Sequence, residues 1–306
     1  LAMLYFRASK CDYVVLETGL GGREDATNVV TTTVIEVITP ISMDHMAILG
    51  DTIAEIAVEK AGIIKPNTIV VSAKQHIDAE KVLSERCKSL GCELRTVADT
   101  EIKVCSLGLR DQSFEYRDWH DVHISLAGTY QFKNASLAIM ATEALRDKGC
   151  DISDQAVYAG LKAARWVGRF TQIAEAPAGI IDGAHNDGAA IALEDSVQQY
   201  FGDKKVILVI GIFKDKEYES VLAHLVPLAK QVITVETPNS DRALPADVLM
   251  EKAFRYSEHV EAAESICKGM EAAHSYALQD DVILVCGSLS FLGDVKQFVD
   301  RRRNNG

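Results

Sequence analysis

Residues 13–30 have the sequence YVVLETGLGGREDATNVV, and the rest of the chain is interpreted outward from them. Residues 13–17 are nearly all apolar, as in a parallel strand that is covered on both faces. A glycine-rich turn follows, and residues 29–39 are rich in β-branched side chains, which predicts a second strand that Pro40 ends. Glu17 and His45 come at or just beyond the ends of these two strands. Both side chains are therefore expected at the edge of a sheet, where ligands bind.

The glycine-rich turn at residues 19–23 does not match a known phosphate-binding loop. The dinucleotide pattern G-x-G-x-x-G would need a glycine at position 24, which is Glu24. The P-loop ending G-K-[ST] is absent from the whole sequence. Taken alone, these glycines favour a tight turn after the strand over a nucleotide cradle.

Residues 52–63 predict a helix with an unusual lysine. Thr52 and Glu55 fit a capping box at its start. Lys60 lies seven residues after Ile53 and therefore falls within the apolar face of the helix. The residues alone favour a lysine that extends its amine to the edge of that face over one that is buried for function.

The middle of the chain predicts hairpins and then a long helix. Residues 92–127 alternate between apolar and polar side chains, and residues 128–148 have a helical pattern that ends at Gly149. Asn134 shares a helical face with Leu137 and Ala138. We expect it to be buried, where its amide would need hydrogen-bond partners from a loop or from a ligand.

From Gly168 onward, strands and helices alternate regularly, which predicts a doubly wound α/β domain. Asp182 ends one predicted strand, and the segment Asp182-Gly-Ala-His185-Asn186 leads into a helix. Amides at the start of that helix could bind an anion, although Asp and Asn are also common helix caps. The predicted domains are residues 1–168 and 169–306, with a short hinge near Gly168.

Composition restricts the class of protein. The chain has 306 residues, 48% hydrophobic and 25% charged, with a formal net charge of −12, so a general nucleic-acid binder is unexpected. Seven scattered cysteines are typical of reduced thiols in the cytoplasm. No apolar run is long enough to span a membrane. The chain begins with Leu, and residues 1–10 look like the end of an amphipathic helix, so we expect a fragment that lacks an amino-terminal segment.

Six segments together resemble the folylpolyglutamate and dihydrofolate synthases of the Mur ligase family. They are ETGLGGREDATNVV, SMDHMAILGDTIAEIAVEKAGIIKP, GTYQFKNASLAI, VGRF, DGAHN and CGSLSFLGDV, and they extend from residue 17 to residue 294. The resemblance implies an α/β fold with two domains. A partial P-loop-type ATPase domain without its P-loop segment would precede a Rossmann-like carboxyl-terminal domain.

The resemblance also implies a function and a cofactor set. The activity would be an ATP-dependent ligation of L-glutamate to dihydropteroate or tetrahydrofolate through an acyl phosphate. ATP would be a substrate, and Mg²⁺ and a monovalent cation would be bound. A monomer without nucleic-acid or membrane partners is implied. Because the phosphate cradle is absent, we expect this chain alone to have little or no activity.

Site residues are implied position by position. Glu17 and His45 would bind Mg²⁺, and Lys60 would be carbamylated and face that metal. Asn134 would contact adenine, Arg169 and Asp182 would reach ATP, and His185 would lie near the reacting phosphates. The substrate-binding turn would contain Arg23, Asp25 and Ala26. Val167 stands where the family usually has proline, which would loosen the hinge but leave Arg169 in place.

Three alternatives to a folate ligase remain open on the sequence. The first is a Mur-type ligase that acts on a cell-wall precursor. The second is a non-catalytic α/β binding module. The third is a dinucleotide-binding enzyme, which the missing G-x-G-x-x-G makes the weakest of the three.

Overall fold

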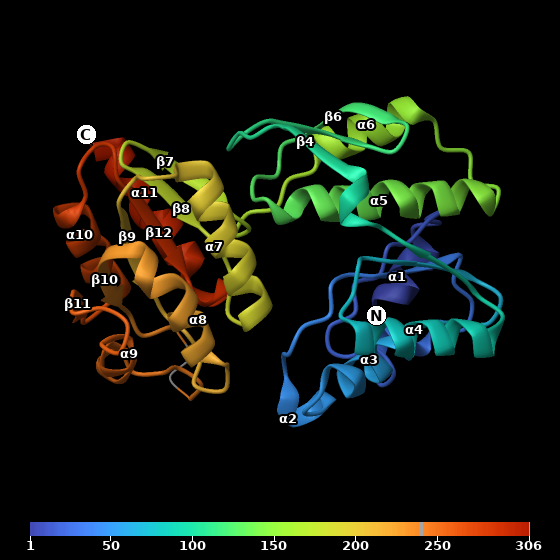
Figure 1. The fold of residues 1–306 in the computed structure, drawn as a ribbon, viewed down its shortest axis with the longest axis horizontal. Helices are drawn as coiled ribbons and strands as arrows, with labels where there is room; N and C mark the ends of the chain where they lie inside the picture. The colour runs from blue at the N-terminus through green and yellow to red at the C-terminus, as the bar shows by residue number, and fades with distance from the viewer. Residues whose placement is uncertain (239–240, 306) are drawn as a thin grey trace. The chain divides into compact units, whose positions relative to one another are not determined.

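The computed structural model describes residues 1–238 and 241–305, which form two compact α/β units (Figure 1). Unit 1 comprises residues 1–41 and 46–96, and unit 2 comprises residues 42–45 together with the chain from residue 97 onward. The predicted α/β class is confirmed. No helix within the described ranges is both long and apolar enough to cross a bilayer.

Unit 1 contains a three-stranded parallel sheet with the order β1-β2-β3. Its strands are β1 (Ile35–Ile38), β2 (Ile69–Ser72) and β3 (Glu93–Thr96). Its helices are α1 (Ala2–Ala8), η1 (Ala26–Val29), α2 (Met46–Leu49), α3 (Ile53–Ala61) and α4 (Ile77–Leu90). All four residues of the central strand β2 are buried. The core also includes Ile56 and Ala57 from α3 and Leu83 from α4.

Two strand predictions in unit 1 differ from the structure. Residues 13–17 form no strand, and Val15 is 97% exposed. A strand needs a neighbour for its main-chain hydrogen bonds, and none of the described strands pairs with this segment. The strand predicted over residues 29–39 is limited to β1, because residues 26–29 turn into η1.

The helix predicted over residues 52–63 is confirmed as α3, together with its cap. The Thr52 hydroxyl accepts a hydrogen bond from the Glu55 amide at 3.2 Å, and the Glu55 carboxylate accepts one from the Thr52 amide at 3.1 Å. The capping box therefore forms in both directions.

Unit 2 begins with an antiparallel sheet that was predicted as hairpins. Its strands are β4 (Ile102–Ser106), β5 (Gln112–Tyr116) and β6 (Trp119–Ile124), with η2 (Asp99–Glu101) before them. The first part of the predicted hairpin region is instead β3, which pairs in parallel with β2 of unit 1 after the α4 crossover. The helices α5 (Tyr130–Asp147) and α6 (Asp154–Ala163) follow.

The doubly wound part of unit 2 is a six-stranded sheet with the order β11-β10-β9-β12-β8-β7. Only β7 is antiparallel to its neighbour β8. The strands are β7 (Thr171–Glu175), β8 (Ala178–Ile181), β9 (Val206–Ile210), β10 (Ala229–Thr234), β11 (Val260–Ala262) and β12 (Val282–Cys286). The strand β11 was not predicted, because three half-exposed residues at a sheet edge give a weak signal.

Helices cover both faces of this sheet (Figure 1). They are α7 (Asp187–Phe201), α8 (Tyr218–Leu225) with η3 (Val226–Leu228), α9 (Ala246–Ala253), α10 (Ile266–Tyr276), and α11 (Leu292–Asn305) after η4 (Leu289–Phe291). Successive residues of β9 alternate between two cores. Leu208 packs in the core that contains residues of α7 to α9, and Ile207 and Val209 pack in the core that contains residues of α10 and α11.

Candidate active site

The glycine-rich turn of unit 1 packs directly on the end of α3. A Cβ atom on Gly22 would lie 2.8 Å from the Glu59 carbonyl oxygen, and one on Gly62 would lie 2.5 Å from the Arg23 Cα atom. The Arg23 amide donates to the Glu59 carbonyl at 2.9 Å, and its guanidinium pairs with the Glu59 carboxylate. The two glycines thus allow a main-chain contact that places Arg23 beside the helical turn carrying Lys60.

Asp25 holds this turn in shape. Its carboxylate accepts hydrogen bonds from the Gly19 amide at 2.9 Å, the Leu20 amide at 3.0 Å and the Thr27 hydroxyl at 2.6 Å. The Thr27 hydroxyl, followed by the Leu20 amide, lowers the pKa of Asp25 to about 2. Ala26 follows as the first residue of η1. The predicted substrate residues therefore lie in one ordered turn around an ionised carboxylate.

Lys60 and Glu17 also belong to unit 1. Lys60 is half-buried and follows the buried residues Ile56 and Ala57 on α3, so it borders the apolar face as predicted. Glu17 is exposed, in the segment that forms no strand. His45 is part of unit 2.

In unit 2, Lys216 joins Asp44 to His45. Lys216 follows β9, its side chain is only 8% exposed, and its Nζ atom lies 2.8 Å from Asp44 Oδ1 and 3.2 Å from His45 Nε2. An ammonium group only donates, so His45 Nε2 accepts and the imidazole is neutral. Burial, with the charges of Lys216 and His185, lowers the pKa of His45 against the opposing charge of Asp44.

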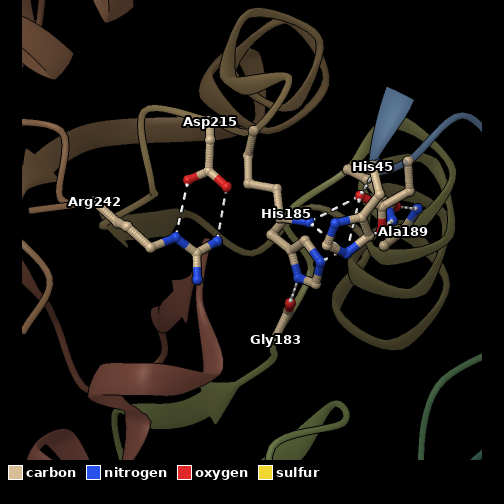
Figure 2. Close-up of polar contacts among 9 residues, drawn as sticks. His45, Gly183, His185, Ala189, Asp215 and Arg242 are labelled. Carbon is tan, nitrogen blue, oxygen red and sulfur yellow. Dashed lines mark hydrogen bonds and ion pairs between the residues drawn. The ribbon is translucent and has the colours of Figure 1, made fainter. Parts of the chain in front are cut away.

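The second oxygen of Asp44 faces the start of α7. Asn186 Nδ2 donates to Asp44 Oδ2 at 2.9 Å, and the Asn186 Oδ1 atom caps α7 by accepting from the Ala189 amide at 2.9 Å. His185 Nδ1 donates to the Gly183 carbonyl at 2.8 Å, and its Nε2 atom lies 3.7 Å from Asp44 Oδ2 (Figure 2). Burial opposes ionisation of Asp44, but its neighbours His185, Lys216 and Asn186 outweigh burial and hold its pKa well below the usual range.

The loop that carries Lys216 is fixed from its other side. The Asp215 carboxylate pairs with the Arg242 guanidinium at 2.7 Å, as Figure 2 shows, and the Lys214 amide donates to the Arg242 carbonyl at 2.9 Å. The Arg242 guanidinium stacks over the Phe213 ring at 4.5 Å. A cavity of about 490 Å³ lies beside Lys216 and is also lined by Asp187 and Glu217, among others. The site thus presents one buried ammonium next to a space that a small ligand could occupy.

Arg169 and Asp182, the two residues that the resemblance assigns to ATP, lie close together. The Arg169 Nη1 atom is 3.0 Å from the position that a Cβ atom would take on Gly183. Asp182 is 3% exposed and accepts from the Phe170 amide at 2.7 Å, the Ala184 amide at 2.7 Å and the Tyr130 hydroxyl at 3.0 Å. Burial raises the pKa of Asp182, although these donors and the charge of Arg169 oppose the rise. Two of these three donors are main-chain amides, so Asp182 fixes the main chain around it.

The expectation that Asn134 is buried is wrong. Asn134 and Ala138 are exposed, whereas Ala135, Ile139 and Met140 form the buried face of α5. The helical period places the buried stripe one residue further along than predicted. The Asn134 amide donates to the Gln131 side chain at 3.0 Å. Its amide is therefore accessible, which suits a ligand contact better than a core position does.

Three residues of the cluster around Lys216 were missed by the sequence analysis: Asp44, Asn186 and Lys216 itself. Asp44 and Asn186 stood inside quoted motifs but had no assigned role. Lys216 lies in the segment Gly211-Ile-Phe-Lys-Asp-Lys216, which follows the carboxyl end of β9. Ligands of parallel sheets bind at such positions. This position in the sequence was therefore the signal that could have identified Lys216.

The described residues contain no group of three or more His, Cys, Asp and Glu side chains that could hold a metal ion together. Mg²⁺ is often bound by only one or two protein side chains, with waters and substrate phosphates as its other ligands. Glu17 offers an exposed carboxylate, and the neutral imidazole of His45 offers a single lone-pair nitrogen, Nε2, which faces Lys216 in this structure.

Two family models match the chain. The Mur ligase middle domain matches residues 1–142, and the glutamate ligase domain of the Mur ligases matches residues 168–289.

Individual relatives agree with these family matches. The chain is 33% identical over 303 residues to the dihydrofolate synthase/folylpolyglutamate synthase of Bacillus subtilis, covering 97% of this chain and 70% of that protein. It is similar to the crystal structure of Mycobacterium tuberculosis folylpolyglutamate synthase complexed with ADP and AMPPCP, with 29% identity, a TM-score of 0.86, and coverage of 97% and 71%. Escherichia coli FolC in complex with DHPP and ADP matches with 29% identity, a TM-score of 0.83, and coverage of 99% and 70%. The chain therefore belongs to the Mur ligase family, among the dihydrofolate and folylpolyglutamate synthases.

Proposed function

We propose that this chain acts in an ATP-dependent ligase that joins L-glutamate to dihydropteroate or to a tetrahydrofolate. The observation that carries the proposal is the cluster of His45, His185 and Lys216 around Asp44, in a chain 33% identical to a dihydrofolate synthase/folylpolyglutamate synthase. The names of the relatives and their complexes with ADP and DHPP support the substrates.

The reaction has two steps. The carboxylate of the folate-type substrate attacks the γ-phosphate of ATP and forms an acyl phosphate with release of ADP. The amine of glutamate then attacks the acyl carbon, phosphate leaves with the electron pair of the broken C–O bond, and the amine loses its proton. Side chains chiefly orient the reactants and stabilise charge. Lys216 and His185 would stabilise negative charge on the reacting groups.

Roles for the remaining residues follow from the family resemblance and from their local structure. Glu17 and His45 would hold Mg²⁺, which neutralises phosphate charge when bound. Asn134, accessible on α5, would contact adenine, and Arg169 would reach the phosphates. Asp182 would support the nucleotide site indirectly, by accepting hydrogen bonds from the main-chain amides of Phe170 and Ala184. The binding of a monovalent cation stays a prediction.

The ordered turn of unit 1 would lie along the pterin-bearing substrate. Arg23, Asp25 and Ala26 are its members, and the ionised Asp25 keeps its shape. We further propose a functional division near Gly168, which is supported by the start of the matched glutamate ligase domain at that residue. The seven free cysteines support a reducing compartment such as the cytoplasm.

The test is phosphate release and glutamate incorporation with ATP and dihydropteroate in a P-loop-containing version of the chain, because the chain alone is expected to have little or no activity, and it compares Lys216→Met with Lys214→Met. Lys214 is an exposed lysine two residues away and serves as the matched control. Loss of a preorganised charge commonly lowers kcat by about 100-fold or more, so K216M should lose activity by that order and K214M should keep it. Equal activity of both variants would remove Lys216 from the mechanism. Incorporation only with muramyl acceptors would assign the cell-wall reaction instead.

A further inference from the structure

A buried polar network ties the start of α5 to the glutamate ligase domain of unit 2. The Tyr200 hydroxyl, on α7, donates to the Gln112 side chain and accepts from the Gly128 amide at 3.1 Å. One turn earlier on α7, the Ser196 hydroxyl accepts from the Thr129 amide at 3.1 Å. Two consecutive amides ahead of α5 are therefore held by two side chains of one helix.

The network is well enclosed. Gln112 and Ser196 are fully buried, and Tyr200 is half-buried with its ring centroid 5.0 Å from that of the fully buried Phe170. Burial raises the pKa of Tyr200 to about 12, so the hydroxyl keeps its proton and donates at any physiological pH. Loss of the Tyr200 hydroxyl would be costly in such a place, because the Gly128 amide and the Gln112 side-chain oxygen would each lose a hydrogen bond.

A chain of contacts leads from Tyr200 to Asn134. The Gly128 carbonyl accepts from the Gln131 amide at 3.1 Å, and the Gln131 side chain accepts from the Asn134 amide group at 3.0 Å. The place of the Asn134 side chain thus depends on the place of Gly128. Gly128 itself has φ +106, and a Cβ there would lie 2.9 Å from the Tyr130 ring, so the segment has little room to adjust.

The same network reaches Arg169 and Asp182. The Tyr130 hydroxyl donates to Asp182, which also accepts from the Phe170 amide. Phe170 has a positive φ of 42, and the residue before it is Arg169. An unfavourable backbone conformation of a non-glycine residue persists only where its surroundings hold it. Phe170 is held there by the Asp182 bond and by the packing of its ring on Tyr200.

We infer that Tyr200 is a positioning residue that sets Asn134 relative to Arg169 for adenine-nucleotide binding. The inference rests on the proposed function, because it takes Asn134 and Arg169 as nucleotide contacts. Simple packing would also explain a buried tyrosine. It does not explain why the bonds of Tyr200 and Ser196 converge on the two amides that precede the helix of Asn134.

The test compares Tyr200→Phe with Tyr158→Phe. Tyr158 is half-buried and donates a comparable bond to the His120 carbonyl at 2.9 Å, away from this network, so Y158F controls for the loss of a tyrosine hydroxyl. For Y200F we expect the KM for ATP, and the Kd for ADP by calorimetry, to rise about 10-fold, with kcat at saturating ATP within about 3-fold. Hydrogen exchange of the Gly128 and Thr129 amides should accelerate in Y200F and stay unchanged in Y158F.

Ser196→Ala gives a second, smaller perturbation if Y200F does not fold. It should raise the KM for ATP in the same direction and accelerate exchange of the Thr129 amide. Wild-type protein that binds ADP, with unchanged Kd values in both Y200F and S196A, would overturn the inference while leaving the proposed function intact. With both variants made in a P-loop-containing version of the chain, a wild-type form of that version that binds neither ATP nor ADP would overturn the proposed function and the inference with it.

Discussion

At the scale of single residues, Lys60 is the side chain whose chemistry is most unusual for its place. It follows an apolar helical face and is half-buried, beside the turn that carries Arg23. The family resemblance implies that the amine of this lysine combines with carbon dioxide to give a carbamate. Such a product would replace a positive charge with a negative one at this position.

Carbamylation of Lys60 has a direct spectroscopic test. Protein equilibrated with ¹³C-bicarbonate should show a carbamate carbon signal in its NMR spectrum, and Lys60→Met should lack it. Lys74→Met is a suitable control, since Lys74 is exposed and pairs with Glu80 at 2.7 Å. A signal that persists in K60M would assign the carbamate elsewhere, and no signal in wild-type protein would contradict the prediction.

At the scale of elements, the contact between the glycine-rich turn and α3 depends on two glycines, Gly22 and Gly62, which have no side chain. Gly62 has φ −60, so alanine there faces no backbone strain, but its Cβ would lie 2.5 Å from Arg23 Cα. Main-chain atoms cannot move aside as a flexible side chain does. The sequence motifs around residues 19–23 and 59–62 are therefore linked by packing as well as by any catalytic role.

Gly62→Ala should destabilise unit 1 by about 2 kcal/mol through overpacking, and Gly160→Ala is the matched control. Gly160 lies in α6 with nothing within 4 Å of its Cβ position, so alanine there should be neutral or stabilising by about 0.5–1 kcal/mol. Urea unfolding followed by circular dichroism measures both. Equal effects of the two changes would show that the turn can move away from α3.

At the scale of the whole molecule, the two units have cores of unequal size. Unit 1 has a three-stranded sheet, and unit 2 has a six-stranded sheet besides the three-stranded sheet β4-β5-β6. Each unit buries a cysteine: Cys87 in α4 and Cys286 in β12. Burial raises the pKa of Cys87 to about 11 and raises that of Cys286 well above its usual value. Both thiols should therefore be inert until their unit unfolds.

Thiol labelling across a urea series should then report each unit separately. We expect Cys87 to become reactive at a lower urea concentration than Cys286, because a smaller core buries less apolar surface. The exposed Cys267 should react at every concentration and serves as the internal control. Mass spectrometry measures the labelled fraction of each cysteine. Coincident labelling midpoints for Cys87 and Cys286 would show that the two units unfold together.

The sequence by itself determined the features that depend on neighbours within a few residues. The capping box of Thr52 and Glu55 and the regular succession of strands and helices after Gly168 are of this kind. It also determined the family, because six motifs in a fixed order carry more information than any one of them.

Only the tertiary structure decided which side chains meet. Asp44 and Lys216 are 172 positions apart, and Tyr200 and Gln112 are 88 apart, so no local pattern connects them. Two predictions also failed for lack of tertiary information: the burial of Asn134 and the strand at residues 13–17. The helical period leaves the buried stripe uncertain by one residue, and a strand forms only where another strand supplies its hydrogen bonds.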